Sequence, residues 1–232
     1  MFVHQGFARA GSIALAATAI IATSAHADIV YTQDFSGSIG SEWSHNSTET
    51  TPLGGHSFLG QFGNTEVTLS LAGLAPHDSV SISFDLFVIG TWDGNDAPGP
   101  DSWMFGVDDD QVLRTTFANG SPEHMGTQAY PGVEGSGFNI GQSGALQTNT
   151  LGYSWYGPNH DQTRDAVYRL TFTVPHTADS VVFSFSAAGL QKLADESWGI
   201  GGNLVVRTTA VPAPGTLGAI AGLGLVARRR RR

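Results

Sequence analysis

The chain has 232 residues, is poor in charge and rich in glycine, and contains no cysteine. Its 30 glycines make up about 13% of the sequence, against a typical share of about 7%, and charged residues contribute only 13%. The absence of cysteine excludes a disulfide scaffold, a thiol nucleophile and a thiolate-bound metal. Because 41% of the residues are hydrophobic, the chain can still bury a core, and this composition favours an all-β domain over helices.

The formal net charge of −9 is unevenly distributed along the chain. Six of the 11 basic residues lie near the ends, at Arg9 and at positions 228–232, whereas all 20 acids lie between Asp28 and Glu196. Residues 28–209 therefore hold 20 acids and five bases, a net charge of −15. We expect no nucleic-acid partner, because phosphate binding needs clustered lysine and arginine. Divalent cations are the expected counter-ions for this acidic segment.

Residues 1–27 have the features of a secretory signal peptide. A weakly charged start leads into an apolar run over residues 13–22, and Ala25-His26-Ala27 supplies a small-x-small cleavage pattern. The apolar run is short for a membrane span. The alternative is a buried helix. We expect secretion, with a mature chain that starts at Asp28.

Residues 28–209 predict one all-β domain. Residues 168–174 and 181–186 alternate clearly between apolar and polar side chains, the pattern of a strand that buries one face. No stretch of this body shows a sustained helical period, although residues 190–196 could form one helical turn. About nine strands in this length favour a two-sheet β-sandwich of jelly-roll type. The candidate strands are 29–35, 57–61, 66–71, 79–89, 102–107, 111–117, 166–174, 180–187 and 199–207.

The loop at residues 92–101 is a candidate metal site. It follows the strongest predicted strand and carries four side chains with oxygen atoms that can bind a cation: Asp93, Asn95, Asp96 and Asp101. Ca²⁺ takes six to eight such oxygens from carboxylates, amides, backbone carbonyls and water. No glutamate stands twelve positions on, so the loop is not an EF-hand. The alternative is an ordinary turn of Asx and glycine residues.

Glu196 is the fifth candidate ligand in the predicted Ca²⁺ site. Because the last strand of a sandwich commonly pairs near the first, Glu196 could approach Asp34 or the 93–101 loop. The segments 35–37, 92–95, 99–101 and 196–200 loosely resemble concanavalin-like and carbohydrate-binding-module-like jelly-roll domains of secreted bacterial proteins. That resemblance implies that Asp93, Asp101 and Glu196 bind a metal or fix the sheet edge.

A second kind of site is suggested by aromatic residues. Sugar-binding sandwiches stack pyranose rings on Trp or Tyr, and Asn and Asp hold the hydroxyl groups. Trp92, Trp155 and Tyr156 are the candidate ligand-binding residues, and Trp43 could join them. The alternative is that these aromatics cover the core, the commoner fate of tryptophan. Trp155 and Tyr156 end a Gly-rich stretch, 122–156, which we expect to be an ordered loop packed on one sheet.

The sequence predicts no catalytic residue. Glycoside hydrolysis needs two carboxyl groups about 5–9 Å apart in a cleft. Glu123, Glu134 and Glu196 are candidates, but no supporting strand motif surrounds them. The histidines have no metal-ligand spacing, and no Gly-x-Ser-x-Gly stands between a strand and a helix. We therefore expect a protein without enzymatic activity.

Residues 210–232 have three parts that together suggest a sorting signal. Val211-Pro212-Ala213-Pro214 is followed by a short apolar stretch over residues 216–227 and then by five arginines. We expect the apolar stretch to form a hydrophobic sorting helix. The stretch is shorter than the roughly 20 residues that span a bilayer stably, and the arginines favour the cytoplasmic side. This tail resembles the PEP-CTERM sorting domain, also called the ice-binding-protein C-terminal domain, although Ala213 stands where the family name implies Glu.

The resemblance implies a secreted bacterial protein whose tail inserts transiently in the inner membrane and is handled by an exosortase-type transpeptidase. The alternative is a plain C-terminal membrane anchor. We expect a structural or adhesive protein at the cell surface or in extracellular polysaccharide. A carbohydrate-binding module is the second hypothesis, and a glycan-cleaving sandwich enzyme is the third.

Overall fold

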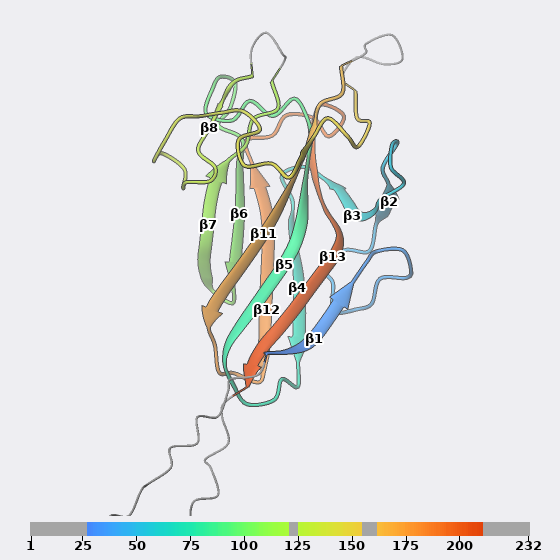
Figure 1. Ribbon diagram of the computed structural model, residues 1–232, viewed down its shortest axis with the longest axis vertical. Coiled ribbons are helices and arrows are strands. Elements are labelled where there is room, and N and C mark those ends of the chain that lie inside the picture. Colours follow the sequence, from blue (N-terminus) through green and yellow to red (C-terminus); the bar gives the residue numbers. More distant parts are fainter. Residues whose placement is uncertain (1–26, 121–124, 155–161, 211–232) are drawn as a thin grey trace, which may run out of the picture. The chain divides into compact units, whose positions relative to one another are not determined.

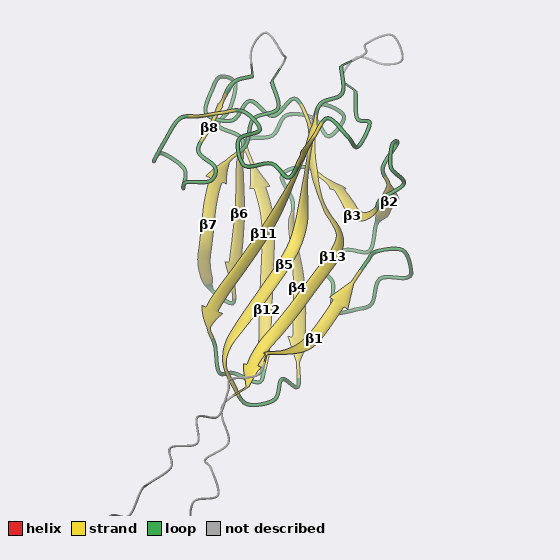
Figure 2. Cartoon of the chain, viewed as in Figure 1, coloured by secondary structure: helices red, strands yellow, loops and turns green. Residues whose placement is uncertain are grey.

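The computed structural model describes residues 27–120, 125–154 and 162–210, and these residues form strands, turns and loops with no helix (Figures 1 and 2). The predicted all-β class is confirmed for this part of the chain. Within it, no helix has the length and hydropathy needed to cross a membrane. The predicted signal peptide, apart from its last residue Ala27, and the predicted tail beyond position 210 lie outside the described residues.

Two large antiparallel sheets make up most of the domain. The seven-stranded sheet has the order β10 (Gln147–Thr148), β11 (Asp165–Pro175), β5 (His77–Gly90), β13 (Glu196–Ala210), β3 (Ser57–Phe62) and β2 (Thr48–Thr50), and β1 (Ala27–Gln33) also pairs with β13. The four-stranded sheet has the order β4 (Glu66–Ala72), β12 (Ser180–Ala188), β6 (Ser102–Val107) and β7 (Asp110–Thr116). A small two-stranded sheet joins β8 (Thr127–Gln128) and β9 (Asn139–Ile140).

Each of the nine predicted strands overlaps an observed one, from β1 to β13. The strands β2, β8, β9 and β10 were not predicted, because two or three residues are too few to show a period. Residues 192–196 form a single hydrogen-bonded turn, in which the backbone N–H groups of Asp195 and Glu196 donate to the Lys192 carbonyl over 2.8 and 3.1 Å. This turn is not extended into a helix, because β13 begins at Glu196.

Aromatic side chains from both sheets share one core. Phe105 of β6 stacks on Phe172 of β11, with ring centroids 4.3 Å apart, and it also packs on Phe84 of β5 at 6.0 Å. On β12, Val181, Phe183 and Phe185 are buried while the residues between them are more exposed, which is the predicted two-residue period. Two sheets that bury their facing sides against each other are consistent with the expected β-sandwich.

The second half of β5 is buried on both faces. Phe84, Leu86 and Val88 belong to the core between the sheets, whereas Phe87 and Ile89 pack with Phe58, Leu151 and Val167 in a smaller cluster on the outer face. A loop therefore covers this end of the outer face. This covering explains why the sequence of the strand changes from alternating to continuously apolar.

The Gly-rich stretch is an ordered loop over its described part, residues 125–154, as expected. The ring of Tyr130 packs on Phe117 and Tyr168, with centroids 5.0 and 5.1 Å away. The carboxylate of Asp165 accepts hydrogen bonds from four successive backbone N–H groups of residues 150–153. Phe117 follows β7 of the four-stranded sheet, whereas Tyr168 and Asp165 belong to β11 of the seven-stranded sheet. These contacts therefore hold the loop against the ends of both large sheets, where packing on one sheet was expected.

Replacing Phe105 by alanine should lower the free energy of unfolding by about 3–5 kcal/mol, because this ring is 1% exposed and joins the two sheets. Phe138 is 84% exposed, so Phe138→Ala is a matched control expected to change stability by less than about 0.5 kcal/mol. Urea denaturation of both variants measures the difference. Equal losses in the two would contradict a core shared by the sheets.

Candidate metal centre

The start of β13 lies beside the end of β5. Glu196 pairs directly with Gly90, and the backbone N–H of Thr91 donates to the Asp195 carbonyl over 2.9 Å. Gly90 has a φ of 85°, and a Cβ at this position would lie 1.8 Å from the Asp195 carbonyl oxygen. Glycine is therefore needed for the two segments to approach this closely. Their approach places Glu196 next to the loop that follows β5.

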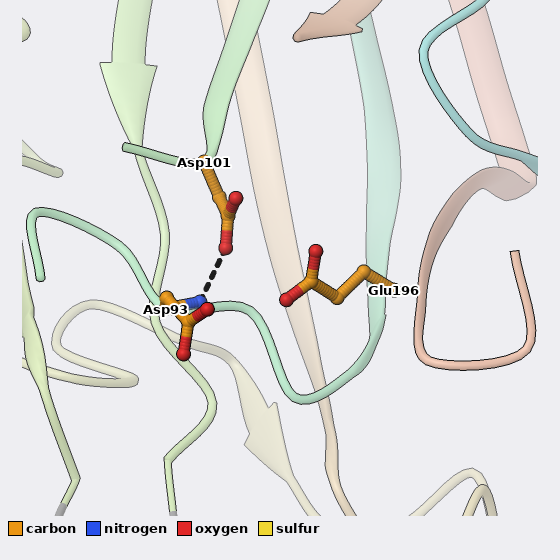
Figure 3. A group of neighbouring side chains, drawn as sticks. All are labelled: Asp93, Asp101 and Glu196. Carbon is orange, nitrogen blue, oxygen red and sulfur yellow. Dashed lines mark hydrogen bonds between the residues drawn. The ribbon is translucent and has the colours of Figure 1, made fainter. Parts of the chain in front are cut away.

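The 92–101 loop folds back on itself, so that its two ends meet. The backbone N–H of Asp93 donates to the Asp101 carboxylate, and the Asp101 N–H donates to the Gly94 carbonyl over 2.9 Å. Figure 3 shows the first of these bonds and the Glu196 side chain extending toward both aspartates. Asp93, Asp101 and Glu196 each offer one carboxylate oxygen, and these atoms all lie within 4.8 Å of one another.

Two of the three carboxylates are fully buried and incompletely hydrogen bonded. Asp101 and Glu196 are both 0% exposed. One oxygen of each is satisfied, because Asp101 accepts from Asp93 and Glu196 Oε2 accepts from the Gln191 N–H over 2.7 Å. The other oxygens, Asp101 Oδ1 and Glu196 Oε1, have no hydrogen-bond partner among the residues that the structure describes. A buried polar atom in this state is costly, and a buried charge more so.

The electrostatics of the cluster are strongly unfavourable for three negative charges. Burial, reinforced by the neighbouring carboxylates, raises the pKa of Glu196 to about 8 and that of Asp101 to about 6. Burial also raises the pKa of Asp93. The ion pairs among the described residues lie elsewhere. Arg164, the nearest buried arginine on the same side of the domain, donates to Thr163 and Gln162 instead.

Asp93 connects the cluster to the surface. It is half-buried and lines a cavity of about 380 Å³ together with Gln191, Asp195 and Asp96. The Gln191 side chain donates to Asp93 Oδ2 over 3.1 Å. A small ion could therefore approach the two buried carboxylates from the Asp93 side, where water is also available to complete its coordination.

The structure divides the predicted set of ligands. The side chains of Asn95 and Asp96 hydrogen bond to threonines of other segments and so fix the loop. Asn95 Oδ1 accepts from the Thr116 hydroxyl over 2.6 Å, and Asp96 accepts from the N–H and hydroxyl of Thr127 over 3.0 and 3.1 Å. Asp34, considered as a neighbour of Glu196, instead accepts from Ser36. The remaining cluster is Asp93, Asp101 and Glu196.

The aromatic residues predicted to bind a ligand are either buried or outside the described residues. Trp92 is 0% exposed, and its indole N–H donates to the Ser197 carbonyl over 2.9 Å. Trp43 is buried as well. Both rings therefore cover the core, which was the alternative interpretation, and neither offers a surface for sugar stacking. Trp155, Tyr156 and the tail residues Val211, Pro212, Ala213 and Pro214 lie outside the described residues.

Two neighbours of the cluster were not predicted. Gln191 donates from its backbone to Glu196 and from its side chain to Asp93, and Asp195 adds negative charge nearby. Both residues lie close to Glu196 in the sequence, and this closeness was the signal that could have identified them. Glu134, a candidate carboxylate for hydrolysis, forms an ion pair with Arg114 at the side of the domain. Glu123 lies outside the described residues.

Comparison with known proteins gives no family assignment. No protein-family model matches the chain, and no curated protein matches it. Among solved structures, it is similar to dimeric latent PorU from Porphyromonas gingivalis, with 9% identity and a TM-score of 0.40 over 77% of this chain and 14% of that one. It is also similar to BtGH115A, a family GH115 4-O-methyl-alpha-glucuronidase with specificity for decorated arabinogalactans, with 13% identity and a TM-score of 0.34. That likeness covers 77% of this chain and 17% of the glucuronidase.

Proposed function

We propose that this protein is a secreted, non-catalytic β-sandwich of a bacterial surface or extracellular matrix, stabilised by a Ca²⁺ ion held by Asp93, Asp101 and Glu196. The observation that carries the cation site is the pair of fully buried carboxylates, each with one oxygen that has no hydrogen-bond partner in the described part of the chain. A divalent cation would contact these oxygens and offset the repulsion among the three acids.

The chemistry of the cluster favours Ca²⁺ over other cations. All three side chains offer hard carboxylate oxygens, and neither histidine nor cysteine belongs to the cluster, which disfavours the softer transition metals. Mg²⁺ gives up its water reluctantly and demands near-ideal octahedral geometry. Because Asp101 and Glu196 are inaccessible to solvent, the site suits the ion that more readily exchanges water for protein oxygens.

Such an ion would link the two large sheets. Glu196 is the first residue of β13 in the seven-stranded sheet, whereas Asp101 directly precedes β6 in the four-stranded sheet. Asp93 belongs to the loop that crosses between them. A cation bound by all three would therefore hold together the end of the domain that carries the 92–101 loop, here called the loop end. This is a structural role.

The jelly-roll topology is part of the proposal, and the strand order supports it. Setting aside the short strands and β1, one sheet has the order β3-β13-β5-β11 and the other β4-β12-β6-β7. Strands that follow each other in the chain mostly lie in different sheets, as in the pairs β5 and β6, β11 and β12, and β12 and β13. Eight strands that alternate in this way are characteristic of a double Greek key.

The lack of catalysis is proposed from the same geometry. Asp101 and Glu196 are close enough to resemble a pair of hydrolytic carboxylates, but a glycan cannot reach two side chains that are 0% exposed. The secreted location and the sorting by an exosortase-type transpeptidase are proposed from the signal peptide and from the likeness of residues 210–232 to PEP-CTERM tails.

Ca²⁺ should raise the stability of the full-length protein relative to a sample in EGTA, by about 2.7 kcal/mol when free Ca²⁺ is one hundred times the Kd. Asp101→Asn and Glu196→Gln should abolish this gain, because each removes a buried ligand charge. Asp109→Asn, in an exposed turn, is the matched control and should keep it. Scanning calorimetry with and without Ca²⁺ measures the shift, and an unchanged wild-type melting temperature would refute the cation site.

Without the metal, stability should fall as the pH rises from about 4 to about 8. The folded protein holds protons on Glu196 and Asp101 at pH values where the unfolded chain has released them, since their pKa values are raised to about 8 and about 6. Their contribution is complete at low pH and is lost as the pH passes through these values. Urea denaturation in EGTA at several pH values tests this. Glu196→Gln should flatten the upper part of the decline, and a decline of unchanged slope in that variant would contradict the assignment.

Deletion of residues 211–232 should remove any membrane-associated precursor and release the protein directly, because the apolar stretch and the arginines are what would retain it. Immunoblots of fractionated cells that produce the full and the shortened chains give the readout. Ala213→Glu, which keeps the whole tail, serves as the control. If the shortened chain were processed and located as the full chain is, the tail would have no role in sorting.

A further inference from the structure

A second recess lies on the outer face of the seven-stranded sheet, away from the carboxylate cluster. It has a volume of about 390 Å³, within the range of roughly 300–1,000 Å³ usual for small-molecule sites. It is bordered by the segment after β1, by the start of β3 and by the loop around β10. Its floor is formed by β11, β5 and β13, which lie side by side at the front of Figure 1.

The register of these strands explains the recess. Val167, Phe87 and Gly199 lie opposite one another, and the next outward-facing row is Arg169, Asp85 and Gly201. The Phe58 ring covers Gly199, where a Cβ would lie 2.4 Å from it, and the Phe87 ring covers Gly201, where a Cβ would lie 2.6 Å away. Both rings therefore rest directly against the β13 backbone. From β13 itself, Gly202 and Asn203 line the recess.

The polar groups of the recess form a fixed arrangement. The Arg169 Nε and Nη2 atoms donate to the two Asp85 oxygens over 2.8 and 2.9 Å. The Asp85 side chain is only 10% exposed, whereas the Arg169 side chain is 52% exposed. Nη1 of Arg169 and the ring of His56, which also lines the recess, make no hydrogen bond to any residue that the structure describes. Donors and acceptors therefore face the recess from a rigid base.

The charge of the recess disfavours an anionic ligand. The Asp85 carboxylate is neutralised by the Arg169 guanidinium, which leaves the negative charge of Asp34 at the rim. The exposed apolar part of the wall comes from Leu146, which is 53% exposed, whereas Phe87 and Leu151 are buried beneath it. A recess that combines a small apolar surface with a guanidinium–carboxylate pair matches a molecule with C–H groups and many neutral hydroxyl groups.

We propose that this recess binds a neutral saccharide, with Arg169 and Asp85 hydrogen bonding its hydroxyl groups and Leu146 contacting one of its C–H faces. Trp92, one of the aromatic residues that the sequence suggested, does not line this recess, because it is buried and borders the cavity beside the cation cluster. The recess supplies a ligand class for the adhesive role and does not depend on whether Ca²⁺ is bound.

The test uses the purified full-length protein on an array of neutral and uronic-acid-containing oligosaccharides, followed by calorimetric titration with the neutral oligosaccharide that binds most strongly. Arg169→Ala should weaken binding at least tenfold. Arg169→Lys keeps a positive charge beside Asp85 but loses the two-pronged contact, and it should also weaken binding. Arg207→Ala is the matched control, since Arg207 is an exposed residue of β13 in the same sheet and does not line the recess.

Melting temperatures of all variants, measured with Ca²⁺ and with EGTA, separate this proposal from the cation site. Binding that is lost in the Arg169 variants while their Ca²⁺ response persists supports the recess. Failure of every neutral oligosaccharide to bind, binding of acidic oligosaccharides alone, or equal affinities of Arg169→Lys and the wild type would each overturn it. None of these outcomes changes the prediction for the cation site.

Discussion

The loop end of this domain depends on how the charge of three neighbouring carboxylates is balanced. Asp101 and Glu196 are withdrawn entirely from water, and the backbone satisfies only one oxygen of each. Two means of balance are open to such a cluster, namely protons or a cation. Protons suffice at acidic pH, as the raised pKa values indicate. At neutral pH and above, a bound Ca²⁺ ion provides the balance in our account.

This constraint also explains the local architecture around the cluster. Gly90 allows the turn before β13 to approach the end of β5, and the register then places Glu196 at the base of the 92–101 loop. Asn95 and Asp96, which do not join the cluster, attach that loop to Thr116 and Thr127. The loop is therefore fixed on its outer side by hydrogen bonds, and the cation would fix it on its inner side.

Much of the fold could be predicted from the sequence, because long strands that bury one face have a visible period. β12 and β11 are the clearest examples, and their alternating residues line the core as expected. The site was predicted only in part. The oxygen-rich loop was visible, and Glu196 was expected near it, but the division of the acids was not. Whether a loop carboxylate turns toward Thr127 or toward Asp101 depends on contacts with segments distant in sequence. The burial of Trp92 and the recess beside Arg169 likewise depend on strand register, which no local pattern reveals.

The two proposed sites have different roles in the domain. The cation would stabilise the loop end, and the outer face of the seven-stranded sheet would present the recess to extracellular polysaccharide. The most direct test of the central claim is a crystal structure of the protein grown with CaCl₂, with the anomalous signal measured at a wavelength where calcium scatters strongly. Our account predicts a peak bounded by Asp93, Asp101 and Glu196, with oxygen ligands at about 2.3–2.6 Å. The absence of a peak there, with the carboxylates hydrogen bonded to one another through protons, would contradict it.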